Sequence, residues 1–326
     1  MCEHVPVMLK EAVEWLGCTP GGTLFNGAVG LGGHARAILE RSNRRGANAE
    51  AQRRREPIRL IAIDADAEAL REARKTLSAW KERVDFVRDN FRNLGRVLKR
   101  LGIGGVDGIL LDLGMSSAQL GVPLRGFALY KSGALDMRFD RRQRLTAAEI
   151  VNRYPESEIV KIIRELGEER SAGRIASAIV RRRERAEISS TTELAELVVE
   201  VVGRRRGGIH PATKTFQSLR IAVNGELESL RDALPEAIVA LKPGGRLVVI
   251  SYHSLEDRIV KQTFRDFERG CLCRASFPVC RCGRVSEIEV LTKKPIRPSA
   301  GEIEENPRSR SGRMRVCERK RKNGDM

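Results

Sequence analysis

Polar side chains end four successive apolar runs near the start of the chain, and their types could do chemistry. They are Asn26, Asp64, Asp89 with Asn90, and Asp112. Apolar runs that alternate with helical patterns are typical of parallel β-strands, whose carboxyl ends meet at one edge of the sheet. Carboxylates there can accept hydrogen bonds from a ribose, an adenine amine or an amine substrate. The pattern predicts a binding and reaction site at that edge.

The segment 26–34 is a glycine-rich loop between the strand Leu24-Phe25 and the helix Ala35–Leu39. Glycines let a backbone pass close to a ligand, and the N–H groups at a helix start can bind an anion. The loop also fits the permissive dinucleotide-binding pattern G-x-G-x-x-G/A. It therefore predicts a nucleotide-like ligand and leaves NAD and S-adenosylmethionine both open.

Each acidic strand end has a binding interpretation and a structural alternative. Asp64 can accept both ribose hydroxyls, or it can cap the next helix, which is the better interpretation for Asp66. The segment Asp89-Asn90-Phe91 could bind adenine through an amide or carboxylate and a ring, or it could form a plain turn. Asp112 can hold the amino-acid part of a cofactor or accept a proton from an amine substrate.

The alternation of strands and helices stops after Leu113. The next strand, Arg246–Ser251, follows a turn at 242–245, far beyond the dozen or so residues that a crossover needs. Helical patterns fill the interval at 146–151, 157–166, 174–183 and 193–202, the last capped by Thr191 or Thr192. Candidate strands at 288–292 and 313–317 would complete the sheet. We predict an α/β, Rossmann-like fold with a mostly parallel seven-stranded sheet (residues 1–122 and 213–326) and an inserted helical domain (123–212).

The charge balance indicates an anionic partner. Lys and Arg number 60 against 43 Asp and Glu, which gives a formal net charge of +17, and such an excess attracts polyanions. Arginine-rich clusters at 181–183, 204–206 and 308–322 are candidates for phosphate contact or for solvated surface. Aromatic residues make up only 4%, which argues against many stacked bases. Because the sequence has neither a long apolar span nor a signal-peptide pattern, we expect a cytoplasmic protein with no membrane partner.

Four cysteines gather near the C-terminus, at positions 271, 273, 280 and 282. Four thiolates suit tetrahedral zinc, but the usual spacing is C-x2–4-C and here it is C-x-C. Reduced thiols and disulfides are the alternatives, and we assign no metal from the sequence. The segment His253–Asp257 lacks the nucleophile elbow of a hydrolase; we expect it to line the substrate pocket or to cap a helix through Ser254 and Asp257.

Motifs along nearly the whole chain resemble those of one family. They are His4-Val5-Pro6-Val7, Gly32-Gly33-His34, Asp112-Leu113-Gly114, Ser116-Ser117, Gln119-Leu120, Arg125-Gly126-Phe127, Leu135-Asp136-Met137-Arg138, Gly167-Glu168-Glu169-Arg170, His210–Gln217, His253–Arg258 and Asn306-Pro307-Arg308. In this order they are similar to the MraW/RsmH family, bacterial methyltransferases that modify N4 of a cytosine in the decoding region of small-subunit (16S) ribosomal RNA.

The resemblance implies a class I methyltransferase fold and S-adenosylmethionine as cofactor. It implies cofactor contacts at Gly32, Gly33, His34, Asp64, Phe91, Asp112 and Gln119. The partner it implies is small-subunit ribosomal RNA or the assembled small subunit, met through the inserted domain. One departure concerns the start of the loop, where Asn26-Gly27-Ala28 replaces a pattern that resembles Asp-Gly-Thr. The departure removes a carboxylate that could hold the cofactor's ammonium or the loop N–H groups.

Asp112 is our candidate catalytic residue, because its carboxylate could orient the cytosine amine or accept a proton from it. Asp136 and His253 are weaker candidates for this role. Two rival interpretations remain. One is an RNA-binding assembly factor without catalysis, since Asn26 stands in place of a carboxylate that could hold the cofactor. The other is an NAD-dependent dehydrogenase. The dehydrogenase shares the loop and Asp64 but has no need of a basic insertion.

Overall fold

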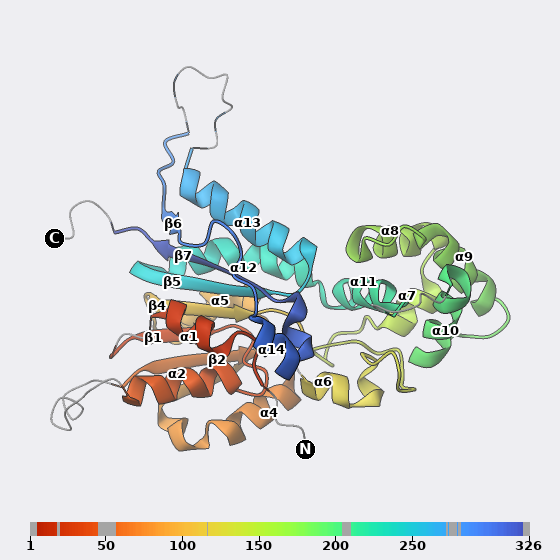
Figure 1. The fold of residues 1–326 in the computed structure, drawn as a ribbon, viewed down its shortest axis with the longest axis horizontal. Coiled ribbons are helices and arrows are strands. Elements are labelled where there is room, and N and C mark those ends of the chain that lie inside the picture. The colour runs from red at the N-terminus through yellow and green to blue at the C-terminus, as the bar shows by residue number, and fades with distance from the viewer. Residues whose placement is uncertain are drawn as a thin grey trace. The chain divides into compact units, whose positions relative to one another are not determined.

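The computed structural model describes residues 5–17, 20–44, 57–115, 117–203, 210–271, 273, 279 and 282–321. The chain divides into two compact units. The larger comprises Met1–Gly114 and Leu227–Met326, and the smaller comprises Met115–Glu226. In Figure 1 the smaller unit is coloured from yellow to green, and the two chain segments of the larger unit are coloured red to orange and cyan to blue.

The larger unit is built on a seven-stranded sheet in the order β3-β2-β1-β4-β5-β7-β6. Its strands are β1 (Thr23–Asn26), β2 (Arg59–Asp64), β3 (Val84–Arg88), β4 (Val106–Asp112), β5 (Leu241–Ser251), β6 (Ile288–Val290) and β7 (Arg313–Arg319). The first five pair in parallel, and β7 runs antiparallel to both of its neighbours. The predicted class I methyltransferase fold with a mostly parallel sheet is confirmed, and its strand order reverses between β1 and β4, where open α/β sheets bind ligands.

Helices cover both faces of this sheet (Figure 1). One face packs on α1 (Leu9–Leu16), α2 (Gly33–Arg44) and α4 (Ala67–Thr76), and the other on α5 (Leu94–Arg100), α12 (Glu226–Ala240) and α13 (Ser254–Arg269). Neighbouring strand residues alternate between the two cores: Leu24 packs in the first and Phe25 in the second. Because both faces of the central strands are buried, these strands contain continuous apolar runs, at Leu60–Ile63, Ile109–Leu111 and Leu247–Ile250, and these runs can be recognised in the sequence.

The smaller unit has a core of its own. Its elements are α6 (Ser117–Gly121), η3 (Pro123–Arg125), α7 (Ala147–Arg153), α8 (Glu156–Gly167), α9 (Ala172–Arg183), α10 (Thr191–Val202) and α11 (Thr213–Asn224). A Cβ at Gly167 would lie 2.6 Å from the carbonyl oxygen of Lys214, so α8 and α11 need a glycine where they meet. The motif that begins at Gly167 therefore has a packing role.

Two local predictions are wrong. The hydroxyl of Ser190, not of Thr191 or Thr192, caps α10 by accepting from the Glu193 N–H at 3.2 Å, and the Thr191 hydroxyl instead donates to the Lys131 carbonyl. The expected turn before β5 lies inside the strand, which begins at Leu241 and shifts register against β4 between Val106 and Gly108.

Among the described residues, no helix is long and apolar enough to cross a membrane.

Candidate active site

The sheet register places two acids on either side of the glycine loop. Asn26, the last residue of β1, pairs with Ala62 of β2 and with Leu110 of β4. Asp64 and Asp112 lie further along those two strands, at their carboxyl ends. The loop that follows Asn26 therefore starts between these two strands. Its Gly30 N–H contacts Asp64, and His34, in the first turn of the helix after the loop, lies beside Asp112.

Close packing explains two of the loop glycines and a left-handed backbone conformation explains a third. A Cβ on Gly27 would lie 2.4 Å from Leu111, and one on Gly33 would lie 2.3 Å from Pro6. Gly32 has φ +87°, a conformation that favours glycine. The backbone thus passes tightly over the sheet into α2, whose first-turn N–H groups have no acceptors within the helix. This leaves backbone donors facing the edge where a ligand is expected.

Asp64 holds the loop and keeps capacity for a ligand. One carboxylate oxygen accepts from the Gly30 N–H at 3.0 Å and the other from the Asp66 N–H at 2.9 Å. Burial raises the pKa of Asp64 to about 6, although these backbone hydrogen bonds act against the rise. A carboxylate offers about four acceptor positions, so Asp64 could also accept a hydroxyl hydrogen. Asp66 accepts from the Glu68 N–H at 2.9 Å, so its predicted capping role is confirmed.

His34 joins the N-terminal segment to the fourth strand. Its side chain is buried, with Nε2 3.0 Å from the Val7 carbonyl oxygen and Nδ1 3.4 Å from Asp112 Oδ2. The same segment is held by Asn306, whose amide donates to the Val5 carbonyl at 3.0 Å. The motifs around Val5, His34 and Asn306 thus meet in one anchoring cluster. Both ring nitrogens of His34 face protein oxygens. A cofactor contact of His34 would therefore be made by the face or the C–H edge of its ring.

Tyr252 is a site residue that the sequence analysis missed. Its hydroxyl donates to Asp112 Oδ1 at 2.7 Å. Burial and the neighbouring Asp112 carboxylate raise the pKa of Tyr252 well above its usual value, so the hydroxyl keeps its proton and acts as a donor. Tyr252 directly follows β5, and the strand-end rule that located Asp64 and Asp112 could have located it. Asp112 is therefore oriented by the Tyr252 hydroxyl, and the ring of His34 lies beside its other oxygen.

The end of the third strand carries a turn. Asp89 accepts from the Asn90 N–H and the Asn93 amide, both at 2.8 Å, and from Arg96 at 2.9 Å. Burial by itself raises the pKa of Asp89, but these hydrogen bonds outweigh that effect and the pKa is lowered. Asn90 in turn accepts from the Arg92 N–H. The side chains of Asp89 and Asn90 therefore stabilise a turn, which was the alternative to adenine binding. Phe91 is half-buried and lies beside Gly27.

The weaker catalytic candidates are engaged in local structure. In the smaller unit, Asp136 pairs with Arg138 through both carboxylate oxygens, at 2.6 and 3.0 Å. Burial raises its pKa, but the Arg138 hydrogen bonds and charge outweigh it, so the pKa of Asp136 is lowered and its carboxylate is a weak base. His253 Nε2 lies 3.2 Å from Glu256 Oε1 in the first turn of α13. Gln119 lies in α6 of the smaller unit, with its side chain buried.

Helix α13 begins differently from the expectation. Its N-cap residue is His253 and not Ser254. Asp257 does not cap the helix; it pairs with Arg315 of β7, with Oδ1 2.6 Å from Nε. The segment after Tyr252 therefore fastens α13 to the sheet.

Several arginines of the predicted phosphate-binding clusters have partners within the protein. Arg182 pairs with Glu193, and Arg183 donates to the Val151 carbonyl. Within 308–322, Arg315 pairs with Asp257 and Arg319 with Glu287, because both belong to β7. These four side chains have structural roles, which weakens their part in RNA binding. The cluster 204–206 lies outside the described residues.

The site has the chemistry that a nucleoside cofactor with a charged end requires. A tight glycine loop opens onto backbone donors, Asp64 offers hydroxyl acceptors, and Asp112 stands at the reversal of strand order. Fold and site together define a class I methyltransferase.

Comparison with known proteins agrees with this class. The family model "MraW methylase family" matches residues 1–320. "Ribosomal RNA small subunit methyltransferase H" of Carboxydothermus hydrogenoformans is 46% identical over 317 residues, 97% of each chain. The protein of the same name from Symbiobacterium thermophilum is 47% identical over 316 residues, 96% of this chain and 95% of that one. A Streptococcus mutans protein solved in complex with SAH covers 97% of this chain and 99% of its own at 8% identity and a TM-score of 0.43.

The chain belongs to the MraW methylase family. Its cofactor is S-adenosylmethionine, and the predicted resemblance is confirmed. The dehydrogenase interpretation is thereby set aside.

Proposed function

We propose that this protein transfers the methyl group of S-adenosylmethionine to N4 of a cytosine in the decoding region of small-subunit (16S) ribosomal RNA. The observation that carries the proposal is the Asp112 carboxylate, oriented by Tyr252 and flanked by His34 at the end of β4 in a member of a methylase family. The names of the relatives supply the class of RNA. An enzyme with this substrate works in the cytoplasm, where bacterial ribosomes are assembled.

The geometry of the larger unit and the family pattern support a proposal for the cofactor residues, and the family pattern alone supplies Gln119. We assign cofactor contact to Gly32, Gly33, His34, Asp64, Phe91, Asp112 and Gln119. Asp64 accepts the ribose hydroxyls with the lone pairs that Gly30 and Asp66 leave, and Phe91 packs on the adenine ring. When bound, S-adenosylmethionine supplies a methyl group on a positively charged sulfur, which makes that carbon an electrophile.

The protein's main catalytic task is positioning. The lone pair of a cytosine amine is delocalised into the ring, so the amine attacks only when it is held in line at about 3–3.5 Å. As the N–C bond forms and the C–S bond breaks, N4 becomes acidic and loses a proton. Asp112 accepts the hydrogen bond that orients the amine and then takes this proton. Tyr252 is the positioning residue that fixes the carboxylate.

The smaller unit is the proposed site of RNA recognition. Tyr130 is 78% exposed, and its ring lies edge-on to His210 at 5.2 Å between centroids. Leu124, from the same part of the chain, is 67% exposed. Proteins recognise single-stranded RNA largely by stacking splayed bases on such rings. A base presented in a loop of ribosomal RNA fits this surface, whereas a stacked duplex base would first have to be flipped out.

Cofactor affinity should depend on pH through Asp64. Its pKa of about 6 belongs to the ligand-free protein, and ribose hydroxyls donate best to the ionised form. Binding therefore lowers that pKa, so affinity rises as pH rises through about 6 and falls below it, by up to about tenfold per pH unit. Calorimetry between pH 5 and 7 checks this. An Asp64→Asn variant should give a flat profile, and a flat profile in the unsubstituted protein would contradict the assignment.

Basic side chains should set RNA affinity and not base choice. Replacing Arg204, Arg205 and Arg206 by alanine is expected to weaken RNA binding and to flatten the plot of log K against log salt, by up to ~0.7 per lost single-strand phosphate contact. The matched control replaces Lys81, Lys99 and Arg100 by alanine. These are exposed cations that precede β3 and β4, near the amino-terminal ends of the strands and away from the active-site edge. Equal slopes for the two triple variants would mean that the arginines act only through net charge.

A transfer assay tests the proposal itself. Isotopically labelled S-adenosylmethionine is incubated with the protein and with naked 16S ribosomal RNA, small subunits or whole ribosomes. We expect label in the RNA of at least one small-subunit substrate and none in large-subunit RNA. Binding of RNA and cofactor without any transfer would instead support the non-catalytic assembly factor.

A further inference from the structure

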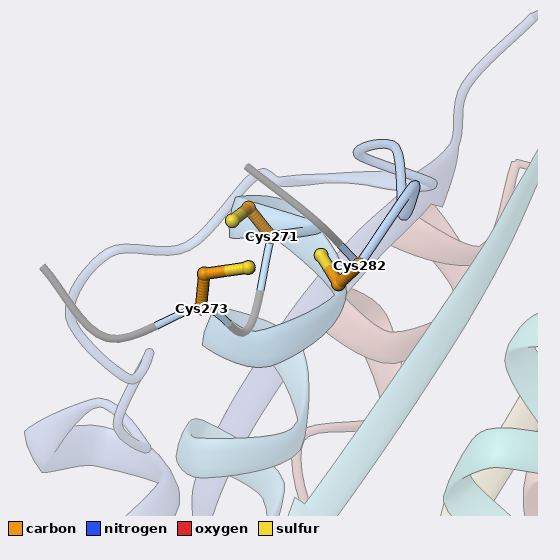
Figure 2. Close-up of side chains that lie close together, drawn as sticks. All are labelled: Cys271, Cys273 and Cys282. Carbon is orange, nitrogen blue, oxygen red and sulfur yellow. The ribbon is translucent and has the colours of Figure 1, made fainter. Parts of the chain in front are cut away.

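A group of cysteines lies far from the active site, in a loop after α13. Cys271 and Cys273 follow the end of that helix, and Cys282 lies on the returning segment (Figure 2). Helix α13 has 16 residues and begins beside the active-site edge; at about 1.5 Å per residue its other end lies about 24 Å away. The cysteines therefore take no part in methyl transfer.

The three sulfur atoms converge. Cys271, Cys273 and Cys282 have Sγ atoms that all lie within 4.8 Å of one another, and Figure 2 shows the three side chains gathered around one space. Four thiolates around zinc at about 2.3 Å would stand about 3.8 Å apart. Closing the observed spacing to that value needs movements of about 1 Å, within reach of side-chain rotation.

The backbone holds both arms of the loop together. The Glu287 N–H donates to the Phe267 carbonyl at 3.0 Å, and the Val290 N–H donates to Glu268 Oε1 at 2.9 Å. Gly270 has φ +70°, and a Cβ there would lie 2.4 Å from the Val285 carbonyl carbon. Only glycine lets the returning chain pass so close to the helix end. The convergence of the cysteines thus follows from a fixed loop base.

The end of α13 is tied to the cysteine segment. Arg269 donates to the Cys273 carbonyl at 3.3 Å. The cluster also stands at the carboxyl end of α13, the negative end of the helix dipole. By contrast, Cys317 is buried in β7, where burial raises its pKa far above the usual value.

We infer that Cys271, Cys273 and Cys282 bind a zinc ion that closes the loop between α13 and β6. Structural zinc sites have four ligands, and these thiolates supply three of them. Cys280, the remaining cysteine of the cluster seen in the sequence, lies outside the described residues. The ion ties the end of α13 to the edge of the sheet, so its role is structural. This site is independent of the proposed methyl transfer.

Metal analysis of the untagged full-length chain, purified without chelator, tests the inference. We expect about one zinc per chain by mass spectrometry. Cys271→Ser, Cys273→Ser and Cys282→Ser should each lose most of it, whereas Cys317→Ala, a cysteine outside the cluster, should keep it. Zinc that persists in all three serine variants, or a disulfide between two of these cysteines in the purified chain, would overturn the assignment.

Cobalt binding keeps the test decisive if a serine variant does not fold. Co²⁺ added to the reduced, metal-depleted protein should produce the thiolate-to-cobalt charge-transfer absorption, which zinc should then displace. Hydrogen exchange should quicken around residues 282–288 when the metal is removed, with no change in the glycine loop. A reduced protein that shows no such absorption and holds no zinc has no metal site there.

Discussion

Replacing Asp64 with alanine is expected to weaken S-adenosylmethionine binding by about 10²- to 10⁴-fold. Two hydrogen bonds to a charged acceptor are lost, each of about 1.5–3 kcal/mol, and every 1.4 kcal/mol is about tenfold in affinity. The Gly30 and Asp66 N–H groups also lose their acceptor, which loosens the loop. Calorimetric titration measures the change.

The control for this variant is Asp85→Ala. Asp85 is a carboxylate near the amino-terminal end of β3, paired with Arg59 at 2.7 Å and away from the carboxyl end where the cofactor residues lie. Its loss should leave cofactor affinity unchanged, and circular dichroism should show both variants folded. An Asp64→Ala protein that binds the cofactor as tightly as the unsubstituted protein would remove Asp64 from the cofactor site.

Turnover should fall about 10²- to 10³-fold in Asp112→Asn at saturating cofactor and RNA, because the amide orients the amine less well and cannot take its proton. Saturation separates this effect from any weakening of cofactor binding. The variant keeps the shape of the side chain, so the fold should survive. Single-turnover kinetics on the best RNA substrate gives the rate.

Tyr252→Phe is the matched variant for the positioning role. It removes the 2.7 Å hydrogen bond to Asp112 but leaves the carboxylate, so we expect a smaller loss of about tenfold in turnover and little change in cofactor affinity. Its pH profile should keep the shape of the unsubstituted enzyme, since Tyr252 stays protonated. If Asp112→Asn turns over normally, another group takes the proton and Asp112 serves only the cofactor.

The fold could be predicted well because its signals are local. Central strands that are buried on both faces contain continuous apolar runs, and residues such as Asp64 and Asp112 mark where these runs end. The predicted N-cap of α10 was wrong because Ser190, Thr191 and Thr192 can all cap a helix. The sequence cannot show that the Thr191 hydroxyl is used in a tertiary contact with Lys131 while Ser190 caps the helix.

The candidate site was predictable in its position and less so in its contacts. Strand-end logic brought Asp64 and Asp112 together, but it could not show that His34 joins Asp112 to the Val7 carbonyl, because that contact depends on how the N-terminal segment packs. Tyr252 was overlooked because an aromatic residue after a strand looks like core. The convergence of Cys271, Cys273 and Cys282 needed the fold, since the C-x-C spacing alone favours no metal.

Identification of the product nucleoside tests the central proposal most directly. Small subunits from cells that lack this methyltransferase are treated with the protein and with S-adenosylmethionine that carries an isotopically labelled methyl group. Their RNA is then digested to nucleosides and analysed by mass spectrometry. The proposal predicts label in N4-methylcytidine, derived from a decoding-region fragment, and its loss with Asp112→Asn. Label in 5-methylcytidine, in another base or in a ribose 2′-O-methyl group would contradict it.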